Sequence, residues 1–171
     1  DKVREVARGQ VGETPNQCQA GLFVTTANDF LANEALQEEV FGSTSLIIEC
    51  ADATEVKQVA EQLEGQLTVT LQSDDGDLDA ARQLLPTLER KAGRILVNGW
   101  PTGVEVSHAM VHGGPYPATS DSRTTSVGSA AIYRFLRPVC YQALPDALLP
   151  EALKESNPLG LRRLYDGKRE S

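Results

Sequence analysis

The sequence contains few cysteines, few aromatic residues and no long apolar run. Its three cysteines, Cys18, Cys50 and Cys140, are odd in number, lie far apart and form no Cys-x-x-Cys pair. Such a pattern supports neither a disulfide framework nor a thiolate zinc site. We therefore expect reduced cysteines with structural roles.

Long apolar segments are also missing. No run approaches the roughly 18 residues that cross a bilayer, and the start of the chain, Asp1–Glu5, lacks the apolar core of a signal peptide. We expect a soluble, cytoplasmic protein with no membrane partner.

Basic residues are outnumbered by acidic ones. The chain has 24 Asp and Glu against 16 Lys and Arg, a formal charge of -8, and no local basic cluster offsets this balance. Because such a charge repels a phosphate backbone, we expect no nucleic-acid partner. The 171 residues, 40% of them hydrophobic, can bury the core of one ordinary domain or of a piece of a larger one.

The middle of the chain has the pattern of an α/β protein. Short apolar or alternating segments predict strands over residues 45–50, 66–72 and 94–98. Helices are predicted between them, one opened by a capping box at Asp52 and one capped by Asp77. This order implies two right-handed crossovers and a parallel sheet.

Glycine and proline shape the rest of the chain. Pro86 should kink or break the second helix, and the Gly- and Pro-rich stretch 99–117 predicts a long loop after the third strand, where α/β proteins usually bind ligands. A helix is predicted near 126–135 and an edge strand over 137–144, between two prolines. From Pro150 onward we expect short turns.

Several candidate sites have plain structural alternatives. His108 and His112 stand four residues apart, but no acidic residue lies between them and Gly113-Gly114 would end a shared helix, so no metal site is predicted. The sequence contains no Gly-x-Gly-x-x-Gly or Gly-x-x-x-x-Gly-Lys motif, which argues against a phosphate-binding loop of these types. None of the cysteines has the surroundings of a catalytic thiolate.

Longer stretches carry a family resemblance. Glu38-Glu39-Val40-Phe41-Gly42 resembles the Glu-Glu-(Ile/Val)-Phe-Gly-Pro signature of the aldehyde dehydrogenase superfamily, with Ser43 in place of the proline. The stretch 93–98 and the pair Gly113-Gly114 are similar to two further motifs of that superfamily. Residues 98–106, 112–119 and 134–142 resemble its branch of α-ketoglutaric semialdehyde (2,5-dioxopentanoate) dehydrogenases. The resemblance covers nearly the whole chain but only the last third or so of the family's chain.

The resemblance implies specific site residues. Glu39 would hold the ribose hydroxyls of NAD or NADP, with Phe41 packed beside the cofactor. The entrance for the aldehyde substrate would be walled by a loop that contains Trp100, Thr102, Gly103, Val104 and Val106. The nucleophilic cysteine would lie upstream, so no catalytic residue is expected in this chain. The alternatives are that Glu38 and Glu39 solvate a turn and that Trp100 and Val104 are core residues.

The resemblance also implies a function for the complete protein. We expect a C-terminal fragment of an NAD(P)-dependent enzyme that oxidises 2,5-dioxopentanoate to 2-oxoglutarate through a cysteine thiohemiacetal, and that is inactive as this chain alone. Residues 1–136 would belong to a three-layer catalytic domain, and 137–171 would form a strand and tail that join subunits into a homo-oligomer. The alternative is a non-catalytic α/β binding or assembly module.

Overall fold

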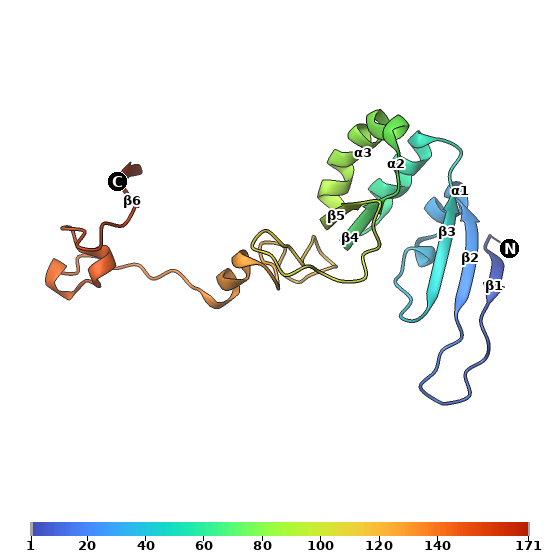
Figure 1. The fold of residues 1–171 in the computed structure, drawn as a ribbon, viewed down its shortest axis with the longest axis horizontal. Helices are drawn as coiled ribbons and strands as arrows, with labels where there is room; N and C mark the ends of the chain where they lie inside the picture. The colour runs from blue at the N-terminus through green and yellow to red at the C-terminus, as the bar shows by residue number, and fades with distance from the viewer. Residues whose placement is uncertain (1, 171) are drawn as a thin grey trace. The chain divides into compact units, whose positions relative to one another are not determined.

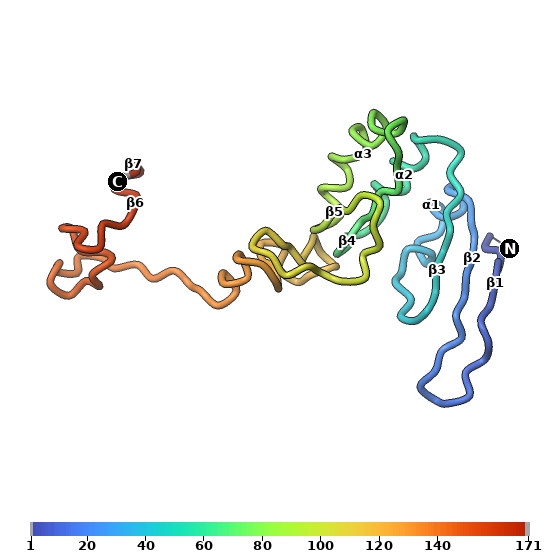
Figure 2. The backbone as a smooth tube through the Cα atoms, viewed as in Figure 1, coloured from blue at the N-terminus to red at the C-terminus, as the bar shows by residue number. Residues whose placement is uncertain are grey.

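The structure is a computed structural model that describes residues 2–170 and consists of two compact units, Asp1–Phe135 and Leu136–Ser171. The first unit contains strands β1 to β5 and helices α1 to α3, and the second contains the short strands β6 and β7 (Figures 1 and 2). No helix within the described residues is long and apolar enough to cross a membrane.

A three-stranded sheet forms the start of the first unit. Strand β2 (Gly21–Thr26) lies in its centre, antiparallel to β1 (Arg4–Arg8) and parallel to β3 (Thr44–Glu49). Figure 2 shows the long loop that joins β1 to β2. Helix α1 (Ala27–Leu31) follows β2 directly, and the Thr26 side chain caps it by accepting a hydrogen bond of 3.2 Å from the backbone N–H of Asp29.

The second sheet is a parallel pair, β4 (Gln66–Leu71) and β5 (Ala92–Val97). The α/β class and the parallel strand pairs agree with the sequence prediction. The prediction of one sheet that joins all three strands is wrong, because β3 pairs with β2 and belongs to a different sheet from β4. Alternating apolar residues define the faces of a strand but not the neighbour that its edge will pair with.

Both helices form where the sequence predicts them, although only the second one joins two strands of the same sheet. Helix α2 (Ala53–Gln62) is capped by Asp52, whose carboxylate accepts hydrogen bonds from Thr54 N at 2.8 Å and Glu55 N at 3.0 Å. The Glu55 carboxylate accepts in return from Ala51 N at 2.7 Å. These bonds satisfy N–H groups that the first turn of a helix leaves without partners.

Helix α3 (Leu78–Lys91) differs from the prediction in two respects. It continues through Pro86, which removes only one backbone donor, because Thr87 and Leu88 beyond it are buried and hold the last turns in place. The cap in front of the helix comes from Asp74, in the short 3₁₀ turn Asp75–Asp77, rather than from Asp77. The helix is therefore not broken at Pro86, and Asp77 stands at its N-cap position without making the predicted side-chain capping bond.

The core of the first unit is small. Ala27, Phe30 and Val59 are buried together, so α1 and α2 share one apolar cluster. Partly buried side chains surround this cluster: Leu31, Leu36, Leu46, Ile48, Cys50 and Leu63. A 3₁₀ turn, Glu34–Leu36, brings the chain from α1 towards β3.

The end of the chain departs most from the sequence prediction. The segment 129–135 is a 3₁₀ helix, Ser129–Phe135, and residues 137–144 form no strand, because no neighbouring strand offers them backbone hydrogen bonds. Past two short 3₁₀ turns, Asp146–Leu148 and Glu151–Leu153, strands β6 (Arg163–Tyr165) and β7 (Lys168–Glu170) form a hairpin. Its turn is Asp166-Gly167, with φ of 46° and 76°, which suits a two-residue hairpin loop.

Candidate functional site

The motif at residues 38–42 forms the turn that leads into β3. All of its side chains are exposed, and Phe41 is 90% exposed. Gly42 has φ of 139°, a backbone conformation that side-chain-bearing residues rarely adopt. The glycine of the motif therefore allows the turn itself.

Glu39 lines a cavity of about 570 Å³ between the two sheets, which we call the Glu39 cavity. Leu46 and Ile48 of β3 line it on one side and Leu67 of β4 on the other. No residue of the described chain donates a hydrogen bond to the Glu39 carboxylate or pairs with it. Both of its oxygens are therefore available to accept hydrogen bonds from a ligand.

The neighbours of Glu39 in the motif lie differently. Neither Glu38 nor Phe41 is among the described residues that line the Glu39 cavity. The structure thus distinguishes the two adjacent carboxylates, because Glu39 lines the cavity and Glu38 does not.

Cys18 lies beside the same turn, a proximity that the sequence does not indicate. A side chain placed on Gly42 would meet the Cys18 Sγ atom at 3.5 Å. Hydrogen bonds from the backbone N–H and the hydroxyl of Ser43 lower the pKa of the exposed Cys18 thiol. The backbone bond from Gly21 N to Ser43 O, 2.9 Å long, ties this turn to the start of β2.

The predicted substrate loop lies beyond the carboxyl end of β5. Trp100 is 82% exposed and Val106 94% exposed, Thr102 and Gly103 are exposed, and only Val104 is partly buried. Trp100 is therefore not a core residue. None of the five predicted wall residues is among those that line the Glu39 cavity, which reaches the start of β4 instead. Within the described chain, the two predicted sets of site residues are not brought together.

Two backbone carbonyls of this loop are held by side chains from β5 and from the residue that follows β4. The Arg94 guanidinium donates to Gly103 O at 2.6 Å and also to the Thr68 hydroxyl at 3.2 Å. The Gln72 side chain donates to Gly99 O at 3.2 Å. These bonds explain how a loop with so few buried side chains keeps its course.

The pair Gly113-Gly114 packs directly on the starts of β4 and β5. A Cβ atom on Gly93 would collide with the carbonyl of Gly113, and one on Gly114 would lie 2.5 Å from Gln66 O. Both glycines of the turn and Gly93 are therefore required by the close approach of three backbone segments.

The two histidines lie in separate surroundings. His108 Nδ1 contacts the Ser129 hydroxyl, while His112 lines another cavity. Within residues 2–170, no group of three or more His, Cys, Asp and Glu side chains could hold a metal ion.

Comparisons with known proteins agree with the resemblance found in the motifs. The chain is 61% identical over 168 residues to "Alpha-ketoglutaric semialdehyde dehydrogenase 2" of Azospirillum brasilense, a match that covers 98% of this chain and 32% of that protein. It is 54% identical over 163 residues to "Alpha-ketoglutaric semialdehyde dehydrogenase" of Acinetobacter baylyi, covering 95% of this chain and 31% of that one. No family model matches the chain.

These matches agree with the class of protein that the motifs indicated, because both relatives are named as semialdehyde dehydrogenases. More particularly, nearly the whole chain is similar to the C-terminal portion of α-ketoglutaric semialdehyde dehydrogenases. The chain spans about a third of the length of these curated relatives.

Proposed function

We propose that this chain is part of an enzyme that oxidises 2,5-dioxopentanoate to 2-oxoglutarate. The observation that carries the proposal is its 61% identity, over 98% of the chain, with a relative named as an α-ketoglutaric semialdehyde dehydrogenase. The exposed carboxylate of Glu39, which has no partner within the described residues and lines a cavity, is compatible with the cofactor-binding role that the family resemblance implies.

The cofactor of this enzyme is NAD or NADP, which accepts a hydride from the substrate when bound. Glu39 fits the role of ribose ligand, since its two oxygens are unpaired and can accept one hydrogen bond from each of two adjacent hydroxyls. Phe41, 90% exposed, is free to pack beside the cofactor. The nucleophilic cysteine belongs to the upstream part of the enzyme, so this chain alone is inactive.

The loop with Trp100, Thr102, Gly103, Val104 and Val106 walls the aldehyde entrance. The exposure of Trp100 and Val106 supports this role, because large apolar side chains held out in water gain stability when a ligand or another protein segment covers them.

The complete enzyme has a three-layer α/β catalytic domain, to which residues 1–136 belong, and it works as a cytoplasmic homo-oligomer. Residues 137–171 join its subunits. The segment 137–144 is exposed for most of its length and has no strand partner within residues 2–170, which suits it to extend a sheet of a second subunit.

The test is an activity assay on the complete enzyme. We expect NADH or NADPH to form with 2,5-dioxopentanoate, and to form much more slowly with pentanal, which has the same carbon chain and no carboxylate. If neither cofactor is reduced with either aldehyde, the proposal is wrong and the alternative of a non-catalytic α/β module gains support.

A further inference from the structure

A second cavity of the first unit, of about 420 Å³, has a polar lining and is not explained by the proposed roles of Glu39 and the Trp100 loop. His112, Arg134 and Asp121 line this cavity, together with Ser120 and other hydroxyl-bearing residues of the segment 119–126. We call it the His112 cavity. It shares the lining residues Leu67 and Ala118 with the Glu39 cavity, so the two cavities are neighbours.

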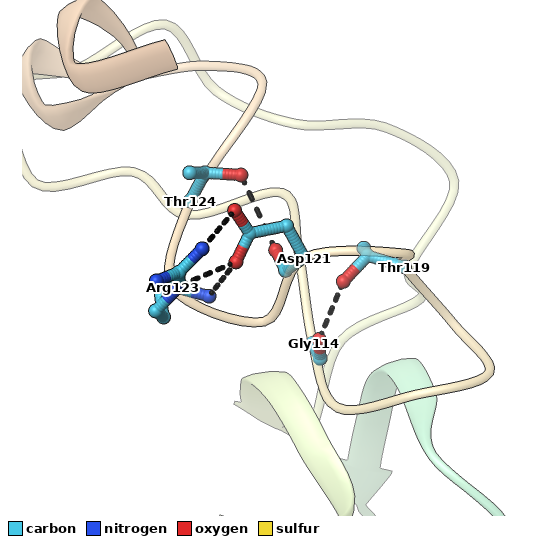
Figure 3. Close-up of polar contacts among 5 residues, drawn as sticks. All are labelled: Gly114, Thr119, Asp121, Arg123 and Thr124. Carbon is cyan, nitrogen blue, oxygen red and sulfur yellow. Dashed lines mark hydrogen bonds and ion pairs between the residues drawn. The ribbon is translucent and has the colours of Figure 1, made fainter. Parts of the chain in front are cut away.

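The wall of the His112 cavity is held by its own hydrogen bonds. Figure 3 shows the Thr119 hydroxyl donating to Gly114 O, at 2.7 Å, and the Thr124 hydroxyl donating to Asp121 O, at 3.2 Å. Thr125 is 4% exposed, and its hydroxyl accepts from His112 N at 2.9 Å. The side chains that could bind a ligand therefore project from a preformed wall.

The one carboxylate among the described residues of the lining is already paired. The Arg123 guanidinium donates to Asp121 through Nε at 2.9 Å and Nη2 at 3.1 Å, and Arg123 N adds a bond of 3.0 Å (Figure 3). These bonds hold the pKa of Asp121 below its ordinary value, and the bonds from the Arg123 side chain have the larger effect. Asp121 therefore stays ionised to a lower pH than an ordinary carboxyl group, with Arg123 as its partner.

The side chains of Arg134, His112 and Ser120 are donors of the lining that have no such partner within the described residues. Within the described residues, the Arg134 guanidinium takes part in no hydrogen bond or ion pair. His112 Nδ1 is buried without a hydrogen-bond partner, whereas Nε2 of the same ring is not among these buried atoms. The imidazole therefore loses the least hydrogen-bonding energy when its proton is on Nε2, from which it can donate a hydrogen bond to a ligand.

We propose that the His112 cavity binds the carboxylate of a small acidic molecule. Arg134 supplies a planar pair of N–H donors, His112 Nε2–H a third donor, and the Ser120 hydroxyl, which has no partner in the described chain, a fourth. The choice of a carboxylate rests on the proposed function, because the aldehyde named for the relatives carries one. An oxyanion such as phosphate is the competing ligand of the same chemistry.

The experiment is an NMR titration of the 171-residue chain, in which the ring nitrogens of the two histidines are observed directly. The probes are glutarate, the uncharged glutaramide and inorganic phosphate, all at constant ionic strength. We expect glutarate to shift the His112 signals with saturation while His108 stays unchanged. A shift by glutaramide of equal size, a tighter response to phosphate, or a shift that never saturates would overturn the proposal.

Charge variants give a second readout. Arg134→Gln should weaken glutarate binding about tenfold, which is what one charge-assisted hydrogen-bonded contact contributes. Arg4→Gln removes the same charge from an exposed strand that does not line the cavity and should leave the affinity within about twofold. If both variants weakened glutarate binding equally, the effect would come from the net charge of the chain, and the proposed site would be wrong.

The two proposals fail separately. If glutarate does not bind while the complete enzyme oxidises 2,5-dioxopentanoate, only the His112 site is wrong. If glutarate binds at His112 while the complete enzyme reduces no cofactor, the proposed function is wrong and the carboxylate site remains.

Discussion

The side-chain amide of Asn98 makes two hydrogen bonds to the backbone of Ser73. Its Oδ1 atom accepts from Ser73 N at 2.9 Å, and its Nδ2 group donates to Ser73 O at 2.8 Å. The backbone N–H of Asn98 also donates to Leu71 O at 2.8 Å. The asparagine of the Val-Asn motif thus fastens the exit of β5 to the chain that leaves β4, and it does so with φ of 52°.

The first prediction concerns this clamp. Asn98→Ala removes both side-chain bonds and places alanine at a left-handed φ, so it should destabilise the fold by about 2–3 kcal/mol. Asn98→Gly also removes both bonds but tolerates the backbone conformation, so it should cost about 1 kcal/mol less. Urea unfolding of the 171-residue chain measures both values. Equal losses would show that the backbone conformation contributes nothing.

The second prediction concerns the cofactor in the complete enzyme. Glu39→Gln keeps the shape of the side chain but removes its charge and turns one acceptor into a donor. Hydride transfer should slow by up to about a hundredfold, because the nicotinamide ring is less often aimed at the substrate. Single-turnover measurements with deuterated aldehyde report this step. Glu38→Gln is the matched control, since Glu38 does not line the cavity. Equal small effects of the two substitutions would support the alternative that both carboxylates only solvate a turn.

The third prediction compares the effect on stability of alanine substitutions at two glycines, Gly93 and Gly103. Gly93→Ala sets a methyl group against the carbonyl of Gly113, a backbone atom that cannot move aside, and should destabilise the fold by about 1–3 kcal/mol. Gly103→Ala meets nothing within 4 Å and should change the stability by less than about 0.5 kcal/mol. Thermal unfolding of the two variants checks the difference, and a silent Gly93→Ala would mean that the turn does not pack as described.

The fourth prediction concerns thiol reactivity. The bonds from Ser43 lower the pKa of Cys18, while burial, with the nearby Glu55 and Asp52 charges, raises that of Cys50. Because the thiolate is the reactive form, Cys18 should become alkylated at a lower pH than Cys50. Ser43→Ala keeps the backbone bond and loses the hydroxyl, so the midpoint for Cys18 should rise while that for Cys50 stays. Mass spectrometry after iodoacetamide treatment across a pH series gives both midpoints.

The fifth prediction concerns assembly of the complete protein. If residues 137–144 extend a sheet of a second subunit, Val139 and Tyr141 share one face and Gln142 lies on the other. Val139→Lys should therefore shift the mass in light scattering towards smaller species, and Gln142→Lys should change it little. An unchanged mass for Val139→Lys would separate this segment from the subunit interface.

Local patterns made part of the fold predictable. The strands β3, β4 and β5 and the cap at Asp52 follow from alternation, helical spacing and side-chain chemistry within a few residues. Strand β1 could not be found in this way, because all five of its residues are exposed and no apolar period marks it. The parallel pairing of β2 with β3 depends on tertiary contacts between segments that the periodicity of neither contains.

The candidate site shows the same limit. The motif carried by Glu38 and Glu39 was visible in the sequence, but only the fold shows which of the two carboxylates lines a cavity. The approach of Cys18 to Ser43, and the unpaired ring nitrogen of His112, arise between segments distant in the chain and have no local signal.

The position of Gly113-Gly114 has a consequence for the alignment of β4 with β5. The turn contacts both strands at once, through Gln66, the first residue of β4, and Gly93, the second residue of β5. Sliding β5 by a single residue would bring Ala92 or Arg94 under the Gly113 carbonyl, where a Cβ atom has no room. A strand pair with two open edges would otherwise tolerate such slippage. The turn therefore allows only the observed register of β4 with β5 and excludes the registers shifted by one residue in either direction.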